Sequence, residues 1–310
     1  MTCLEAVAGY LPPESTPVSD ILGELGVEEA QIALYRRFYG FSQVRRAPDS
    51  GLRDLMLAAA GKLDALRGVE DRVRYVLYPR TIQLCAPYPL NPLHDVCAEL
   101  GLRRATAFSV TQHACASGLL AVDIAGRLLA ADGDPDALAL IFAGEKAFTP
   151  SAQLIRDTAI MGEGMAVVLV RADGGHDRLL GYATRTLGQF HAAPFLPVKL
   201  DAEFEGIYPA TLAEVVLAAV RQAGLEPRDI DLVLPHNVNL ISWLRVAKMT
   251  GLGRDRIFLD NLPVTGHCFC ADSFINHQSA SALGLLRPGD HYLMTAVGLG
   301  ATFSAMVFRH

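Results

Sequence analysis

The chain has 310 residues, of which 51% are hydrophobic, and a formal net charge of −6. This length and apolar content predict a large buried core, built as one big domain or as two fused halves. The acidic balance without a basic cluster argues against nucleic acid as the main partner. The sequence has no run of about 18 uncharged apolar residues, so we expect no membrane span.

The N-terminus and the cysteines indicate the compartment. Residues 1–10 contain Glu5 and have no basic flank, so they do not resemble a signal peptide. The six cysteines are scattered, and the Cys268-Phe-Cys270 spacing is not the C-x-x-C pair typical of zinc sites. We therefore expect a cytoplasmic protein with reduced thiols and no metal.

The first half of the chain alternates predicted helices and strands. Apolar residues at positions 18, 21, 22 and 25 have the spacing of one helix face, which predicts helices within residues 15–39. Further helices are predicted at 54–66, 94–100 and 121–131, and strands at 73–77, 105–110, 137–143 and 165–170. The last two strands are continuous apolar runs, which is typical of strands buried on both faces.

A polar, glycine-rich segment at residues 173–177 separates the two halves. We place the boundary there, which gives an N-terminal half at 1–172 and a C-terminal half at 173–310. In the second half strands are predicted at 178–188, 231–234, 257–259, 291–296 and 302–308, and helices at 211–223, 240–250 and 273–286. Alternating strands and helices predict an α/β fold, and the similar style of the halves suggests an internal duplication.

Cys115 is the first candidate for chemistry, because it lies where a predicted strand turns into a predicted helix. Its neighbours Ala114 and Ala116 are small and leave the sulfur accessible. A helix N-terminus favours the thiolate form of a cysteine, which is the form that a nucleophile needs. The alternative is a buried core cysteine without a chemical role.

Three other strand or turn ends carry polar or flexible residues that could meet Cys115. They are His236-Asn237, the loop 266–272 and the turn Gly298-Leu-Gly300. Sites in α/β sheets collect beyond the strand ends, so these segments are expected to converge. A cysteine nucleophile, His236 as base and a third orienting group form a sensible set. The N–H groups of Cys115 and Leu299 would form an oxyanion hole.

Six short motifs, in their order and spacing, resemble those of the ketoacyl-ACP synthase III family within the thiolase-like superfamily. They are Gly40-Phe-Ser-Gln-Val-Arg-Arg46, Thr111-Gln-His-Ala-Cys-Ala-Ser-Gly-Leu119, Gly162-Glu-Gly164, Pro235-His-Asn-Val-Asn239, Arg287-Pro-Gly-Asp290 and Ala296-Val-Gly-Leu-Gly300. The resemblance implies a duplicated five-layer αβαβα fold and a homodimer. It also implies acyl transfer through a Cys115 thioester, with acyl carrier protein or acyl-CoA as donor and no further cofactor, and it makes His236 the active-site histidine.

One loop departs from the family pattern. The family has an asparagine in a G-N-T-S-A-A-S run, whereas this chain reads Gly266-His-Cys-Phe-Cys-Ala-Asp-Ser273. Alignment from Gly266 without a gap puts His267 at the asparagine position. Alignment from Ser273 makes the loop one residue longer and brings Asp272 to the site instead.

The two alignments predict different reactions. Decarboxylative condensation needs two hydrogen-bond donors on the malonyl thioester carbonyl, and His236 with His267 would supply them, as in the Cys-His-His relatives. A carboxylate from Asp272 would oppose the enolate and instead orient His236 as a base for a hydroxyl or amine acceptor.

We favour the Asp272 alignment. It predicts an acyltransferase that moves an acyl group through Cys115 to an O or N nucleophile of a small natural-product scaffold, without condensation. The alternative is a decarboxylating β-ketoacyl-ACP synthase III. A catalytically silent partner subunit is a third possibility, and the intact Cys115 and His236 argue against it.

A basic set follows the His236 segment in this acidic chain. Lys248, Arg254 and Arg256, together with Asn239, are weaker candidates for binding the substrate or the carrier protein. Positive side chains there would attract an acidic acyl carrier protein, although a solvated charged face explains them equally well.

Overall fold

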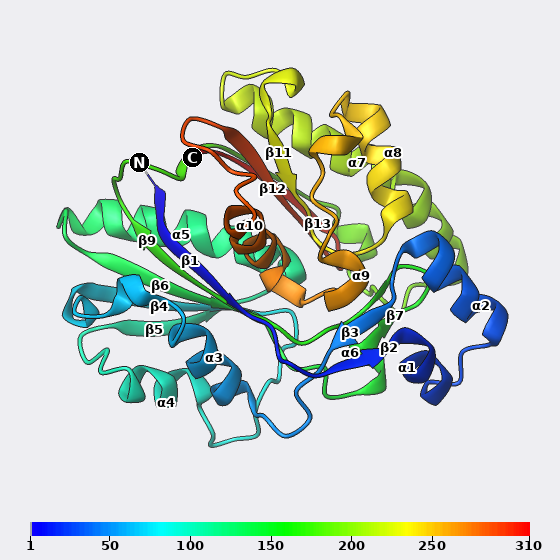
Figure 1. Cartoon of the computed structure of the whole chain (residues 1–310), viewed down its shortest axis with the longest axis horizontal. Coiled ribbons are helices and arrows are strands. Elements are labelled where there is room, and N and C mark those ends of the chain that lie inside the picture. Colours follow the sequence, from blue (N-terminus) through cyan, green and yellow to red (C-terminus); the bar gives the residue numbers. More distant parts are fainter. Residues whose placement is uncertain (1) are drawn as a thin grey trace.

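The computed structural model describes residues 2–310, and its centre is a mixed sheet of nine strands (Figure 1). The strands follow the order β11-β12-β13-β10-β1-β9-β6-β4-β5. Their bounds are β1 Cys3–Tyr10, β4 Val73–Pro79, β5 Thr106–Val110, β6 Leu138–Ala143, β9 Met165–Arg171, β10 Arg178–Thr186, β11 Leu232–Leu234, β12 His291–Gly298 and β13 Thr302–Arg309. Two small ribbons lie outside this sheet: β2 (Ser15–Pro17) pairs with β3 (Gln43–Arg45), and β7 (Leu154–Ile155) pairs with β8 (Ala159–Ile160).

The two sides of the sheet have the same sequence of strand directions. On one side β1, β9 and β6 are antiparallel neighbours, and β6, β4 and β5 are parallel. On the other side β10, β13 and β12 are antiparallel neighbours, β12 and β11 are parallel, and Val233 adds a parallel bridge to Ile257. The sides meet where Cys3 of β1 lies opposite Arg178 of β10. The repeated order fits a duplicated architecture, while the boundary at residue 173 stays a prediction.

Helices form three layers around the two sides of the sheet (Figure 1). α5 (Ser117–Asp132) and α10 (Asp272–Ala282) lie in the middle, where both contact β9 and β12. α3 (Leu52–Ala60) and α4 (Pro92–Glu99) cover one outer face, and α7 (Val198–Gln222) and α8 (Leu240–Thr250) cover the other. The short helices are α1 Val18–Glu24, α2 Glu29–Leu34, α6 Pro150–Gln153 and α9 Leu262–Thr265. This arrangement gives the five layers that the resemblance implies.

The middle layer brings the nucleophile and the loop 266–272 together. The segment Ala114–Asp132 is long and apolar enough to span a membrane, with a mean hydropathy of 1.5. It packs between strands of both sides, so it is a core helix. A Cβ atom at Gly118 would lie 2.7 Å from the carbonyl oxygen of Cys270. Glycine at this position therefore allows α5 to approach the loop that precedes α10.

Two elements differ from the predicted pattern in ways that affect the site. β1 was not predicted, because Cys3–Tyr10 shows no clear alternation, yet it occupies the centre of the sheet. α7 begins at Val198 and runs through Pro209, whereas the prediction begins at residue 211. Proline in a helix interior removes one hydrogen bond and usually ends the pattern. Here the buried side chains on both sides of Pro209, such as Phe204 and Leu212, pack into one core and keep the helix continuous.

Candidate active site

Cys115 lies in a single 3₁₀ turn, Ala114–Ala116, between the end of β5 and the start of α5. Its side chain is 3% exposed. Gln112 and Ala114 have φ values of 74° and 45°, in the left-handed region that residues other than glycine rarely adopt. Such backbone costs about 1–3 kcal/mol per residue and recurs at functional sites. The prediction that Cys115 lies at a strand-to-helix turn is confirmed.

A hydrogen-bonded chain of three side chains starts at Cys115. The Nε2 atom of His267 lies 3.2 Å from the Cys115 Sγ atom, although 152 residues separate them in sequence. On its other side, the Nδ1–H group of His267 donates to Asp272 Oδ2 in a short hydrogen bond. The Asp272 carboxylate also accepts the backbone N–H groups of Asn237 at 2.6 Å and Cys268 at 2.7 Å. The carboxylate is therefore fixed in position and aims the imidazole at the sulfur.

The charges around His267 favour its protonated form. Burial by itself would lower the pKa of this imidazole, but the negative charge of Asp272 and the Cys115 sulfur overcome that effect. Together they raise the pKa of His267 from 6.5 to about 10. An imidazolium next to the sulfur stabilises a thiolate, which is the reactive form of the cysteine.

The partner of Asp272 differs from the expected one. We expected the carboxylate to orient His236, whereas it binds His267, the other residue that was a candidate for the same position. A 3₁₀ turn at Phe269–Ala271 explains this, because it folds the start of α10 back toward His267. Phe269 has φ 55° in this turn. The two alignments of the loop proposed His267 and Asp272 as alternatives, whereas the structure has them hydrogen-bonded to each other.

His236 lies behind the reacting atoms. Its ring centroid is 6.4 Å from that of His267, and its Nε2 atom is 2.7 Å from the hydroxyl of Tyr208. The Nδ1 atom lies 3.4 Å from the Thr295 hydroxyl. Burial, helped by the charge on His267, lowers the pKa of His236 to about 3, so the ring stays neutral. The expected pairing of His236 with Asp272 is thus wrong, because the side chain of Asp272 binds His267 while His236 contacts Tyr208 and Thr295.

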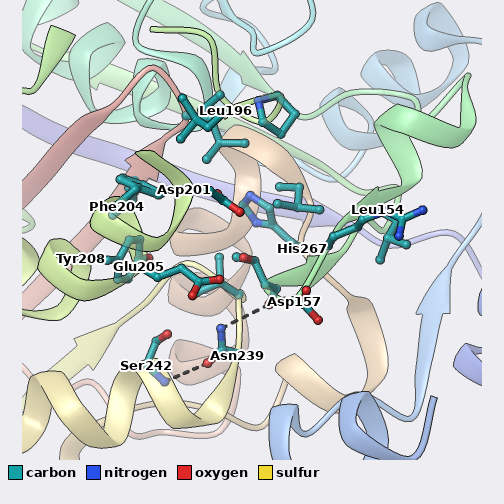
Figure 2. A pocket seen from close by; sticks show the side chains of 18 of the residues that line it. Leu154, Asp157, Leu196, Asp201, Phe204, Glu205, Tyr208, Asn239, Ser242 and His267 are labelled. Carbon is teal, nitrogen blue, oxygen red and sulfur yellow. Dashed lines mark hydrogen bonds between the residues drawn. The ribbon is translucent and has the colours of Figure 1, made fainter. Parts of the chain in front are cut away.

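A cavity of about 690 Å³ opens onto the nucleophile (Figure 2). Cys115 and His267 line it, and Figure 2 shows Phe204 and Tyr208 of α7 on the wall beside His267. Leu299 lines it as well, because the β12–β13 turn packs closely on the turn that holds Cys115. A Cβ atom at Gly298 would lie only 1.8 Å from a carbonyl oxygen of that turn. The oxyanion hole formed by the N–H groups of Cys115 and Leu299 stays a prediction.

Two residues of the site were missed. The Thr81 hydroxyl donates to Cys115 Sγ at 3.3 Å, and the buried Glu145 carboxylate holds Thr81 through its backbone N–H at 2.7 Å. Thr81 begins a proline-rich loop that gives no sequence signal of a site. Tyr208 lies in the part of α7 that Pro209 concealed. The sequence would have indicated Tyr208 as a cavity residue only if a helix that continues through Pro209 had been predicted.

Asn239 has mainly a structural role. Its side-chain oxygen accepts the backbone N–H of Ser242 at 2.8 Å, which makes it the N-cap of α8. It also lines the cavity, next to Ser242 (Figure 2). A cap of this kind stabilises the helix start, and the predicted contact of Asn239 with substrate stays a prediction.

The predicted basic set divides into two kinds of residue. Arg256 donates to the backbone carbonyl oxygens of Arg228 at 2.7 Å and Ile230 at 2.6 Å. These bonds fix a loop, and the expected role of Arg256 in docking a carrier stays a prediction. Lys248 and Arg254 are exposed and remain candidates.

Comparisons with known proteins agree with this fold. The sequence profile "3-Oxoacyl-[acyl-carrier-protein (ACP)] synthase III C terminal" matches residues 220–310. A β-ketoacyl-[acyl-carrier-protein] synthase III of Roseobacter denitrificans is 26% identical, and the alignment covers all of both chains.

Two solved structures share the fold at low sequence identity. ChlB3, described as an acyltransferase, superposes with a TM-score of 0.85 at 22% identity and covers 99% of this chain and 97% of its own. The 3-oxoacyl-[acyl-carrier-protein] synthase III of Aquifex aeolicus gives a TM-score of 0.81 at 21% identity over the whole of both chains. The predicted thiolase-like α/β fold is confirmed, and the chain resembles the ketoacyl-ACP synthase III family in its C-terminal profile and in its full-length relatives.

Proposed function

We propose that the protein is an acyltransferase that moves an acyl group from an acyl carrier protein or CoA thioester, through Cys115, to an O or N nucleophile of a natural-product scaffold. The observation that carries the proposal is the Cys115–His267–Asp272 chain. In this chain Cys115 is placed as the nucleophile, His267 as the base and Asp272 as the carboxylate that orients the base. Acyl transfer to a hydroxyl or amine needs such a base, while enolate formation does not.

The surroundings of His236 support transfer without condensation. Condensation needs donors aimed at the carbonyl oxygen of the malonyl thioester, where charge develops. A neutral imidazole has a single N–H group. The Nε2 atom of His236 lies 2.7 Å from the Tyr208 hydroxyl and its Nδ1 atom lies 3.4 Å from the Thr295 hydroxyl, so both ring nitrogens already have partners. His236 is also not among the residues that line the described cavity.

In the first half-reaction Cys115 becomes acylated. Its thiolate, paired with the His267 imidazolium, attacks the thioester carbon of the donor and forms a new S–C bond. The N–H groups of Cys115 and Leu299 would stabilise the oxyanion. When the intermediate collapses, the S–C bond of the donor breaks and its sulfur takes the proton from His267. The result is an acyl-Cys115 thioester next to a neutral imidazole.

In the second half-reaction the acceptor takes the acyl group. An acceptor hydroxyl or amine gives its proton to Nε2 of His267 as its oxygen or nitrogen attacks the thioester carbon. Collapse expels the Cys115 thiolate and forms an ester or amide. The proton now lies on His267, where Asp272 stabilises it, so the resting ion pair is restored without any other reagent.

The cavity fits a small polar acceptor. Beyond the apolar wall next to His267, the carboxylates of Asp157, Asp201 and Glu205 line it (Figure 2), and Arg156 and Arg245 add two guanidinium groups. Charged side chains of both signs bind hydroxyl and amino groups through hydrogen bonds. This lining favours an acceptor rich in hydroxyl or amino groups, such as a sugar, over a hydrocarbon.

The test is the intact mass of the protein after incubation with acetyl, longer acyl and malonyl thioesters of CoA and of an acyl carrier protein. A stable adduct that is absent in Cys115→Ala supports acylation of Cys115. Methyl glucoside and glucosamine are then added as acceptor probes. Faster loss of the adduct, with an acylated probe as product, supports transfer to oxygen or nitrogen.

Decarboxylative condensation is the second candidate, favoured by the curated relatives that are named β-ketoacyl-[acyl-carrier-protein] synthase III. In that case an acyl adduct would be elongated by added malonyl carrier protein, with loss of carbon dioxide. That result would refute the acyltransferase proposal. A malonyl adduct that keeps its carboxyl group would refute condensation.

The proposal includes the setting in which the enzyme works. We place it in the cytoplasm as a homodimer, with an acidic carrier protein docked on the exposed Lys248 and Arg254. Lys248 belongs to α8, a helix that also contributes residues to the cavity wall. Charge reversal at these two residues should raise KM for acyl carrier protein and leave KM for acyl-CoA unchanged. Size-exclusion chromatography tests the dimer.

A further inference from the structure

Three side chains that can bind a metal come together outside the lining of the cavity. Asp177 precedes β10, His277 is in the middle of α10, and His310 follows β13. Their ligand atoms all lie within 4.8 Å of one another, and none of the three residues lines the cavity that holds Cys115. Both chain ends are on this side of the molecule (Figure 1).

His277 is the decisive member of the group. His277 is only 5% exposed, and neither of its ring nitrogens forms a hydrogen bond within residues 2–310, the part of the chain that the structure describes. The Nε2 atom approaches Asp177 Oδ2 to 3.4 Å without forming a hydrogen bond. Buried polar side chains nearly always have a partner. An unpartnered imidazole directed at a carboxylate is therefore an observation that points to a ligand.

The donor set has the chemistry and spacing of a transition-metal site. Two ligand atoms at 2.0–2.1 Å from a tetrahedral Zn²⁺ ion are about 3.3 Å apart. The approach of His277 Nε2 to Asp177 has about this length, at 3.4 Å. The Nδ1 atom of His310 is closer to the other carboxylate oxygen, at the hydrogen-bond distance of 2.8 Å, and would move apart from it to bind an ion.

We propose that Asp177, His277 and His310 bind a divalent transition-metal ion of the Zn²⁺ type. The exposed ring of His176 lies next to the group, with its Nδ1 atom 3.4 Å from Asp177, and would be available as a fourth ligand. Imidazole and carboxylate ligands suit Zn²⁺ and Co²⁺, whereas Mg²⁺ and Ca²⁺ prefer oxygen ligands alone. The sequence predicted no metal because the ligands are up to 133 residues apart, without a spacing motif.

The site would connect three parts of the fold. It joins the end of β13 and the segment before β10 to α10, the helix that begins with Asp272. A bound ion would hold this helix, and with it the carboxylate that orients His267. We therefore assign the ion a structural role, measured as stability and not as chemistry at Cys115.

The experiment uses the full chain without a tag at its C-terminus, in a Cys115→Ala background so that the active-site thiol does not bind the metal. The protein is stripped with a chelator and titrated with ZnCl₂ and, separately, CoCl₂ and MgCl₂. We expect one Zn²⁺ per chain and the visible absorption of four-coordinate Co²⁺. At a hundredfold excess of Zn²⁺ over Kd, Tm should rise by about 4 °C.

Matched histidine variants decide the assignment. His277→Gln and His310→Gln should lose the bound ion and the Tm shift, and His191→Gln, which changes an exposed histidine on another segment, should keep both. If His277→Gln does not fold, His310→Gln at the chain end still gives the result. Absence of binding, or binding that both variants retain, would overturn the proposal and leave Asp177 as the partner of two imidazoles only.

Discussion

Replacement of Asp272 by asparagine keeps the size of the side chain and removes the charge that faces His267. Burial alone would lower the pKa of His267, and this charge does most to raise it from 6.5 to about 10. His236 shows the effect of burial without a carboxylate partner, because its pKa is lowered to about 3. We therefore expect a His267 in the variant that is mostly neutral at pH 7.

The size of the effect follows from the same values. The difference between pKa 6.5 and 10 corresponds to about 5 kcal/mol at 1.36 kcal/mol per pH unit, which is a ceiling for the loss. Loss of the orienting carboxylate in a related triad slows catalysis by about 10⁴-fold. For Asp272→Asn we expect acylation of Cys115 to slow by about 10²–10³-fold.

The assay is the pH dependence of Cys115 alkylation by iodoacetamide, followed by intact mass and peptide mapping because the chain has five other cysteines. In the native protein the pKa of about 10 keeps His267 as an imidazolium next to the sulfur, so the rate should change little between pH 6 and 9. In Asp272→Asn the imidazole is mostly neutral, so this charge is missing and the rate should rise with pH.

The control separates chemistry from damage to the fold. Asp201→Asn makes the same chemical change in an exposed residue that lines the same cavity, and it should leave the pH profile unchanged. Asp272 also accepts two backbone N–H groups, so the variant should lose about 1–3 kcal/mol of stability, measured by urea unfolding. A slower reaction with an unchanged pH profile would refute the ion-pair reasoning and leave Asp272 with a structural role only.

Three further predictions test the neighbourhood of the site. Thr81→Val removes the hydroxyl that donates to the nucleophile's sulfur and should slow acylation by about 3–10-fold without loss of fold, measured by intact-mass time courses. Gly298→Ala places a Cβ atom 1.8 Å from a backbone oxygen and should cost about 3 kcal/mol or more in urea unfolding, whereas Gly188→Ala, where a Cβ atom would meet nothing within 4 Å, should change stability by less than about 0.5 kcal/mol. Burial lowers the pKa of His236 to about 3, so the free energy of unfolding should decrease as pH falls from 6.5. Burial raises the pKa of Glu145 to about 7, so the contribution of Glu145 to the free energy of unfolding should increase as pH falls from 7 to 4.5. These two contributions offset each other in the native protein. In Glu145→Gln the free energy of unfolding should therefore fall by about 1.4 kcal/mol per pH unit between pH 6.5 and 4.5. A free energy of unfolding that is independent of pH in this variant would contradict a neutral, buried His236.

Local pattern was sufficient where a residue's role depends on its neighbours in sequence. The buried strands at 138–143 and 165–171 were predicted from continuous apolar runs, because a strand covered on both faces needs apolar side chains throughout. α8 was predicted with its bounds, since the helical spacing begins after Asn239 and ends before Gly251. Cys115 was predicted at a strand-to-helix turn for the same reason.

Local pattern failed where the fold overrides it. α7 continues through Pro209, because packing on both sides of the proline outweighs one lost hydrogen bond. For this reason the prediction missed Tyr208, the residue whose hydroxyl lies 2.7 Å from His236. The central strand β1 was missed because its residues show neither alternation nor a continuous apolar run.

By itself, the sequence predicted the α/β alternation, the place of Cys115 at a strand-to-helix turn and the short loop that carries both His267 and Asp272. Only the tertiary structure decided how those groups are paired. His267 and Asp272 are both in that loop, and a single turn with a left-handed residue directs the carboxylate to one histidine and away from the other. The physical reason is that partners such as Cys115 and His267, 152 residues apart, meet through the packing of α5 against α10 and its loop, which no local spacing encodes.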